Sequence, residues 1–234
     1  MERPCLATPF SLRTSRRRPE PVREEQPRAT GEEPIVVVSG LPRSGTSMMM
    51  QIVEALGVAP LADASRPPDE DNPLGYYELS AVKSLARESR FLEAAGGRSI
   101  KVVSPLLPDL PLRSTDRGYR VLLMERDLDE VLRSQTVMLD RAGGTGERPP
   151  DAAMRRAFEG AHARARGWID ARSDVEGLVV SHRETMSRPG DVVRRVGAFL
   201  GRPQEREALE AAASLVEPRL HRQRGNSLQT PAAL

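Results

Sequence analysis

Four short apolar runs divide the chain, and each is rich in leucine or β-branched residues. Because apolar residues follow one another in these runs with little alternation, they predict strands that are buried on both faces of a sheet. The segments between them have apolar residues at helical spacing, such as Met49, Ile52 and Leu56 after the first run. The four runs are IVVVSG at 35–40, SIKVVS at 99–104, YRVLLME at 119–125 and GLVVSH at 177–182.

Alternation of strands with helices predicts the fold class. We expect an α/β domain, a three-layer sandwich with a central parallel sheet, similar to the fold of P-loop NTPases. Ligands of such sheets bind at the carboxyl ends of the strands. The domain is expected to span residues 34–216, after a disordered leader at 1–33 that is charged, rich in proline and without apolar periodicity. A basic segment and tail follow at 217–234.

Composition narrows the class of partner. The chain has 234 residues, a formal charge of +2 and nearly equal numbers of basic (35) and acidic (33) residues, which favours small anionic ligands over nucleic acid. Cys5 is the single cysteine, so we expect no internal disulfide and no cysteine metal site. No apolar run approaches the roughly 20 residues that span a bilayer. These features predict a cytoplasmic protein without a bound metal.

The first apolar run leads into GLPRSGTS at 40–47, a loop bounded by glycines and followed by a helical pattern. The sequence fits the nucleotide-binding pattern GxxxxGK[ST] except that Thr46 replaces the lysine that contacts the β- and γ-phosphates. Arg43, within the loop, supplies a cation with forked geometry instead. Backbone N–H groups at a helix N-terminus favour an anion. The loop therefore predicts a phosphate site that holds a triphosphate poorly.

A second anion-binding motif follows the third apolar run. In RDLDEVLRSQ, Arg126 comes directly after the strand and Ser134 follows eight residues later. Two helical turns separate them, so Ser134 is expected to lie near the arginine at the carboxyl edge of the sheet.

Together these motifs resemble the sulfotransferase family, whose members transfer a sulfuryl group from 3'-phosphoadenosine 5'-phosphosulfate (PAPS). Family loops commonly read PxSGT followed by Thr or Ser, which PRSGTS at 42–47 matches. In the family an Arg and a Ser at the spacing of Arg126 and Ser134 bind the 3'-phosphate. The resemblance implies that the loop binds the 5'-phosphosulfate through Arg43, Ser44, Gly45, Thr46 and Ser47.

The resemblance also implies roles around the transferred group. Lys101, in IKVVSP, matches the family lysine that contacts the sulfuryl group, whereas Val103 stands where many cytosolic members have a catalytic histidine. A lysine in an apolar strand is costly unless it faces a partner, which favours a functional role. Other branches use a glutamate between the loop and this lysine, which makes Glu78 our first candidate for the base and Asp71 the second. Arg43 and Lys101 would then stabilise charge on the leaving phosphate.

Later segments resemble the family less closely. His182 occupies a position where members often have a tyrosine that touches the nucleotide, in the block VVSHRETMSRPGDVVRRVGAFLG at 179–201. The basic segment with Arg219, Arg222 and Arg224 is either a ligand-binding element or solvated charge.

The resemblance implies sulfuryl transfer from PAPS to a hydroxyl or amine, and two alternatives stay open. One is a P-loop kinase of small molecules that uses ATP and magnesium. The other is a non-catalytic nucleotide-binding protein that has lost its base. Acceptor specificity is expected in the loops at 62–77 and 142–151, whose composition does not distinguish a small molecule from a glycan, lipid or peptide.

Overall fold

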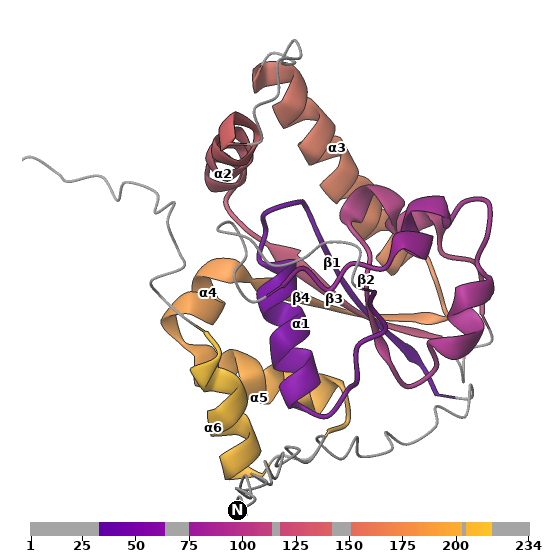
Figure 1. Ribbon diagram of the computed structural model, residues 1–234, viewed down its shortest axis with the longest axis vertical. Coiled ribbons are helices and arrows are strands. Elements are labelled where there is room, and N and C mark those ends of the chain that lie inside the picture. The colour runs from indigo at the N-terminus through magenta and orange to yellow at the C-terminus, as the bar shows by residue number, and fades with distance from the viewer. Residues whose placement is uncertain (1–32, 64–74, 114–117, 142–150, 203–204, 217–234) are drawn as a thin grey trace, which may run out of the picture.

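The computed structural model describes residues 33–63, 75–113, 118–141, 151–202 and 205–216 (Figure 1). Four strands form its sheet: β1 (Ile35–Gly40), β2 (Ser99–Lys101), β3 (Tyr119–Glu125) and β4 (Val175–Ser181). The α-helices are α1 (Thr46–Ala55), α2 (Leu128–Arg141), α3 (Asp151–Asp170), α4 (His182–Ser187), α5 (Pro189–Phe199) and α6 (Arg206–Ser214), and the 3₁₀ helices are η1 (Ser80–Ser84), η2 (Arg90–Ala94) and η3 (Ser104–Asp109).

All strand pairs in the sheet are parallel, and the strand order is β2-β1-β3-β4. The register pairs Gly40 with Met124 and Glu125 with Ser181, so the strands β1, β3 and β4 end at one edge of the sheet. The segments that leave this edge carry the loop at 40–47 that is predicted to bind phosphate, here called the phosphate loop, the motif that begins at Arg126, and helix α4. The carboxyl edge is where ligands of parallel sheets bind.

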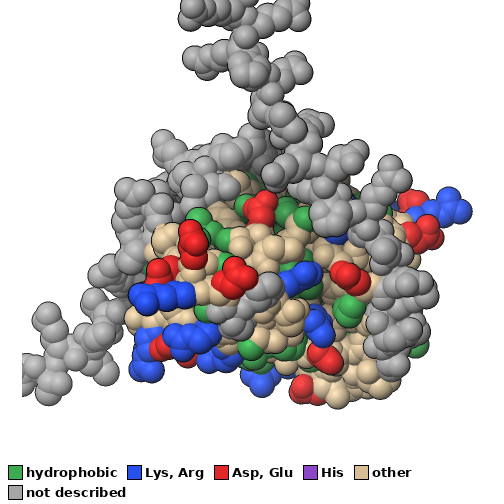
Figure 2. Space-filling view, turned by 90° about the horizontal axis from the view of Figure 1, so that it is seen from below, with side chains coloured by type: hydrophobic (Ala, Val, Ile, Leu, Met, Phe, Trp, Pro, Cys, Tyr) green, Lys and Arg blue, Asp and Glu red, His purple; other side chains and the backbone are tan. Residues whose placement is uncertain are grey.

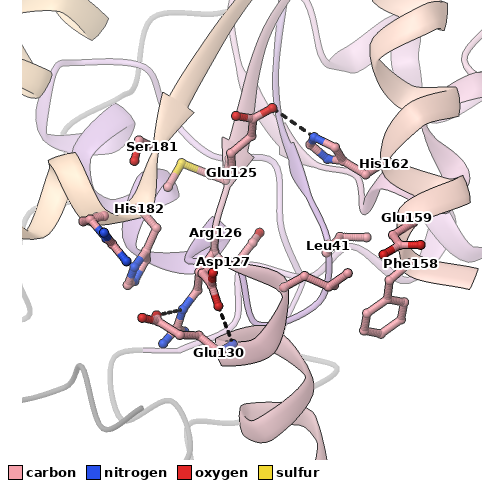
Figure 3. Close-up of a pocket in the computed structure, with 14 residues that line it drawn as sticks. Leu41, Glu125, Arg126, Asp127, Glu130, Phe158, Glu159, His162, Ser181 and His182 are labelled. Atoms are coloured by element: carbon pink, nitrogen blue, oxygen red, sulfur yellow. Dashed lines mark hydrogen bonds and ion pairs between the residues drawn. The ribbon is translucent and has the colours of Figure 1, made fainter. Parts of the chain in front are cut away.

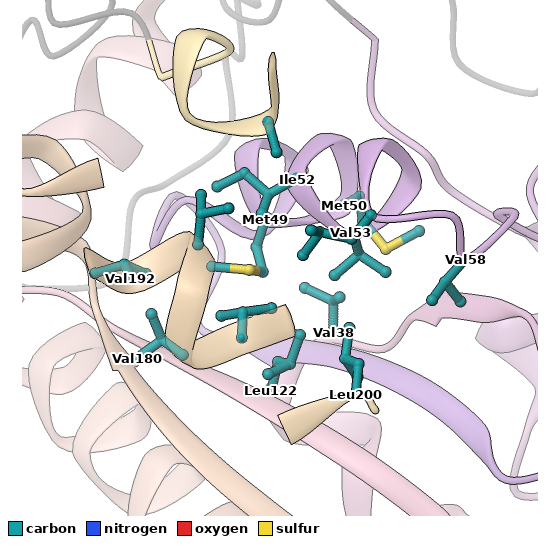
Figure 4. Close-up of a cluster of buried hydrophobic side chains, with 14 of the residues drawn as sticks. Val38, Met49, Met50, Ile52, Val53, Val58, Leu122, Val180, Val192 and Leu200 are labelled. Atoms are coloured by element: carbon teal, nitrogen blue, oxygen red, sulfur yellow. The ribbon is translucent and has the colours of Figure 1, made fainter. Parts of the chain in front are cut away.

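Two separate cores cover the two faces of the sheet. On one face α1, α5 and α6 pack their apolar side chains on Val36, Val38, Leu122 and Val180 (Figure 4). The other face is covered by α3 and the three 3₁₀ helices, which pack on the strands through residues such as Ala165. The predicted three-layer α/β sandwich with a central parallel sheet is thereby confirmed (Figure 1).

Strand boundaries agree with the apolar runs for β1 and β3 and differ for the other two. The second strand ends at Lys101, three residues earlier than predicted, because Ser104 begins η3 with Pro105 in its first turn. The fourth strand begins at Val175 and ends at Ser181, whose hydroxyl accepts a hydrogen bond from the backbone N–H of Glu184 and caps α4. His182 is therefore the first residue of a helix.

Some predicted segments lie outside the described residues. These are nearly all of the leader at 1–33, the segment at 217–234 and the parts of the two predicted specificity loops at 64–74 and 142–150. Within the described part of the chain, no helix is long and apolar enough to cross a membrane. On the face in Figure 2, the described acidic and basic side chains are interspersed.

Two glycine substitutions are expected to have opposite effects on stability. A Cβ atom at Gly118 would overlap the backbone carbonyl of Asp174, which cannot move because it accepts the Tyr119 N–H at 2.8 Å. Gly118→Ala should therefore lower the free energy of unfolding by about 1–3 kcal/mol, as overpacking does. Gly167 lies in α3, and the space that an added Cβ atom would occupy is open. Gly167→Ala should therefore raise the free energy of unfolding by about 1 kcal/mol. Urea denaturation of both variants checks the two signs.

Candidate functional site

The phosphate loop joins β1 to α1 with two left-handed residues. Arg43 has φ 68° and Gly45 has φ 97°, a conformation that glycine adopts without strain. Gly45 is the N-cap of α1. The ring of His182 occupies the space beside Gly45, because a Cβ atom at this position would lie 2.7 Å from His182 Cδ2. The first turn of α1 contains no acidic residue. The N–H groups of this turn and the helix dipole favour an anion at the loop.

Ser44 has the burial expected of a ligand-binding side chain. Its exposed fraction is 1%, and its Oγ has no hydrogen-bond partner among the described residues. A buried hydroxyl without a partner costs free energy, so such groups are typical of binding sites. The Oγ also lies against Gly40, where a Cβ atom would overlap it. Glycine at position 40 therefore leaves room for the hydroxyl inside the loop.

The phosphate loop and the motif after β3 are in direct contact. Arg43 Nε donates to Ser134 Oγ at 3.0 Å, and Arg126 Nη1 donates to the backbone carbonyl of Arg43 at 3.0 Å. Arg126 Nε also forms an ion pair with Glu130 Oε2 at 3.0 Å, and both side chains are nearly buried. The Glu130 N–H donates to Asp127 Oδ1, which caps the start of α2. The two predicted anion motifs are thus brought together, 83 to 91 residues apart in sequence.

Lys101 reaches the phosphate loop from the end of β2. Its Nζ donates to Ser47 Oγ at 3.2 Å and to the backbone carbonyl of Tyr76 at 2.5 Å. The same ammonium group lies 5.7 Å from the centre of the Tyr76 ring, within cation–π range. The lysine is thus placed beside the first turn of α1, where a cation can act on the same anion as the loop.

Glu78 lies two residues after Tyr76, whose backbone carbonyl accepts a hydrogen bond from Lys101. Asp63 N–H donates to the Glu78 carbonyl at 2.9 Å, and Tyr77 OH donates to Glu54 Oε2 of α1 at 2.6 Å. Burial, and then the hydrogen bond to Glu54, raises the pKa of the Tyr77 hydroxyl, which keeps it protonated as the donor. The Tyr77 contact therefore fixes this segment beside α1, and the Asp63 contact joins it to the chain that follows α1. The second candidate base, Asp71, lies outside the described residues.

A cavity of about 550 Å³ opens at the carboxyl edge of the sheet, between the phosphate loop, α3 and α4 (Figure 3). Ser44, Arg126 and His182 line it, whereas Arg43, Ser134, Lys101 and Glu78 do not. His182 is buried, with an exposed fraction of 6%, and borders the cavity at the start of α4. The remaining lining residues are Leu41, Met124, Glu125, Asp127, Leu128, Glu130, Phe158, Glu159, His162, Ser181 and Arg183.

One wall of the cavity was not predicted from the sequence. Glu125 ends β3, and its Oε1 lies 2.9 Å from His162 Nε2 and accepts from Arg166 Nη1 at 2.7 Å. Figure 3 shows the Glu125 carboxylate turned toward His162, across the cavity from Ser181 and His182. The one available signal was a charged residue at the end of a buried strand, directly before Arg126. No spacing linked it to a histidine 37 residues later.

The predicted Arg219, Arg222 and Arg224 lie outside the described residues, so their role stays a prediction. Among the described residues, no group of three or more His, Cys, Asp or Glu side chains is placed to hold a metal ion.

Comparison with known proteins finds similar solved structures but no match in sequence. No protein-family model and no curated protein matches the chain. Similar solved structures include retinol dehydratase in complex with androsterone and the inactive cofactor PAP, at 15% identity and a TM-score of 0.48, over 78% of this chain and 64% of that one. The chain thus spans less than two thirds of that protein.

Two sulfotransferase domains are also similar. One comes from the curacin biosynthetic pathway, at 15% identity and a TM-score of 0.45, over 81% of this chain and 89% of that one. The other belongs to the Synechococcus PCC 7002 olefin synthase, at 16% identity and a TM-score of 0.47, over 90% and 94% of the two chains.

Proposed function

We propose that this protein is a sulfotransferase that transfers a sulfuryl group from PAPS to a hydroxyl or amine acceptor. The observation that carries the proposal is the contact between its two anion motifs, Arg43 Nε to Ser134 Oγ and Arg126 Nη1 to the Arg43 carbonyl. Adjacent anion sites at one sheet edge suit a nucleotide with separate phosphates on its 3' and 5' oxygens. The absence of the P-loop lysine at Thr46 argues against a triphosphate.

The role proposed for each residue follows from its position at the carboxyl edge of the sheet. The loop from Arg43 to Ser47, with the orphaned Ser44 hydroxyl, binds the 5'-phosphosulfate, and Arg126 with Ser134 binds the 3'-phosphate. PAPS supplies the activated sulfuryl group. The acceptor atom forms a bond to sulfur in line with the breaking bond to the 5'-phosphate oxygen. That oxygen takes the electron pair, and Arg43, Lys101 and the loop N–H groups stabilise its charge.

This division of labour resembles phosphoryl transfer, in which positioning and charge matter more than covalent chemistry. The acceptor's proton requires a base. Glu78 stays the prediction from sequence for that role, although its side chain does not line the described cavity.

Calorimetric titration tests the donor. Adenosine 3',5'-bisphosphate should bind about 10- to 100-fold more tightly than adenosine 5'-monophosphate, because the 3'-phosphate adds charge-assisted hydrogen bonds from Arg126 and Ser134. It should also bind more tightly than ATP, with or without Mg²⁺. A preference for ATP with Mg²⁺ would identify a kinase instead.

Transfer itself is tested with labelled PAPS and a broad panel of phenols, alcohols and amines. Sulfated product from any acceptor supports the proposal. Tight binding of the bisphosphate without any transfer would identify a non-catalytic nucleotide-binding protein.

A further inference from the structure

The wall of the cavity formed by α3 carries a histidine paired with a carboxylate. His162 Nε2 lies 2.9 Å from Glu125 Oε1, and the side chains are 26% and 34% exposed. Arg166 Nη1 contacts the same carboxylate oxygen at 2.7 Å. Both Glu125 and His162 line the cavity that also touches Ser44 of the phosphate loop. A pair of this kind is the arrangement in which a carboxylate orients an imidazole for proton transfer.

The pair is placed by the packing of α3 against the sheet and the loop. Glu125 is the last residue of β3 and faces α3, which packs on that face through Ala165. Phe158, one helical turn before His162, packs with Leu41 of the phosphate loop and Val131 of α2 in a third apolar cluster. Residues four apart on a helix lie on one face. His162 is thus one turn along α3 from a residue that touches the loop.

The hydrogen bond to Glu125 determines which ring nitrogen of His162 is available to accept a proton. A neutral imidazole that donates Nε2–H to the carboxylate keeps the lone pair on Nδ1. Val103, at the position of the expected histidine, has no such capacity, and Glu78 does not line the cavity.

We propose that His162 is the general base of the transfer and that Glu125 is its positioning residue, an inference that rests on the proposed sulfotransferase activity. As the acceptor oxygen forms its bond to sulfur, its proton passes to His162 Nδ1. The electron pair of the breaking sulfur–oxygen bond stays on the 5'-phosphate oxygen, and the products are the sulfate ester, adenosine 3',5'-bisphosphate and a proton held by the imidazole. The proposal places the acceptor hydroxyl in this cavity, which Leu41, Phe158 and His162 all line.

A general base and a structural side chain differ in how the loss of transfer rate, after substitution, depends on the acidity of the acceptor. His162→Gln retains an amide that can donate to Glu125 but has no basic nitrogen. Transfer from PAPS to benzyl alcohol, and hydrolysis of PAPS by water, should fall by about 10²- to 10⁴-fold, the usual contribution of a general base. Transfer to 4-nitrophenol above neutral pH, where this acceptor is already ionised, should fall by less than about fivefold because no proton is left to remove.

Four further variants complete the experiment. In His162→Ala, added imidazole should restore transfer to benzyl alcohol. Glu125→Gln should reduce transfer to benzyl alcohol more than transfer to 4-nitrophenol, whereas Arg164→Gln, a change at an exposed site of α3, should leave both rates unchanged. Glu78→Gln is measured in parallel, because selective loss of transfer to benzyl alcohol in that variant alone would make Glu78 the base.

Two results overturn the proposal in distinguishable ways. Equal losses with both acceptors in His162→Gln, or rates equal to wild type, would show that His162 has a structural role or none. If the wild-type protein binds adenosine 3',5'-bisphosphate but transfers sulfuryl to neither acceptor nor water, the sulfotransferase activity itself is wrong.

Discussion

Replacing Lys101 by methionine is expected to lower sulfuryl transfer by about 10²- to 10³-fold, the loss typical when one group that stabilises transition-state charge is removed. Methionine keeps an unbranched apolar stem in the partly buried site but has no charge. Lys101 Nζ lies beside Ser47 at the start of α1, where the proposed reaction would develop charge on the leaving phosphate. Affinity for adenosine 3',5'-bisphosphate should change by less than about threefold, because the interaction strengthens only in the transition state. Steady-state kinetics and calorimetry separate the two quantities.

The chain offers a matched control for this variant. Lys83 is the other lysine of the sequence and is exposed in η1. Lys83→Met removes the same charge from the protein and should leave transfer unchanged. A loss of bisphosphate affinity in Lys101→Met as large as its loss of rate would show that the lysine binds the donor uniformly and does not act on the transition state.

Arg126→Leu should combine a loss of stability with a loss of nucleotide binding. Arg126 and Glu130 form an ion pair with side chains only 9% and 6% exposed. Removal of one partner of a buried pair costs about 3–5 kcal/mol, because the other charge stays behind in a poor environment. The midpoint of chemical unfolding should fall accordingly, and affinity for adenosine 3',5'-bisphosphate should fall toward that for adenosine 5'-monophosphate.

A double variant separates these two effects. Replacing both partners with leucine, in Arg126→Leu/Glu130→Leu, should recover most of the stability because no charge is left buried. It should not recover bisphosphate binding, which needs the guanidinium group. Recovery of both properties would contradict the role of Arg126 at the 3'-phosphate and would leave the arginine a purely structural partner of Glu130.

Local patterns in the sequence were sufficient to predict the class of fold. The continuous apolar runs at 35–40 and 119–125 have the bounds of β1 and β3, because strands buried on both faces cannot contain polar alternation. Lys101 stood out for a related reason, since a charge in such a run needs a partner, and the structure places it beside Ser47. The loop at 40–47 could be predicted to bind phosphate because that chemistry depends on residues that are consecutive in sequence.

The remaining parts of the site depend on tertiary contacts. The hydrogen bond from Arg43 to Ser134 joins residues 91 positions apart, and the pairing of His162 with Glu125 joins residues 37 apart. No sequence spacing identifies either pair. The segments between the partners limit how far apart the two residues can lie, but they do not determine how the two elements pack against each other. Glu125 also appeared unremarkable as the polar end of a strand, and only the packing of α3 on that face shows its partner.

The close approach of Gly45 to His182 has an evolutionary consequence. The N-cap of α1 and the first residue of α4 come from distant parts of the sequence, yet a Cβ atom at Gly45 would lie 2.7 Å from the ring of His182. A substitution at either position therefore changes which residues the other can accept. We expect positions 45 and 182 to covary among relatives of this protein, with a smaller residue at 182 wherever glycine is lost at 45.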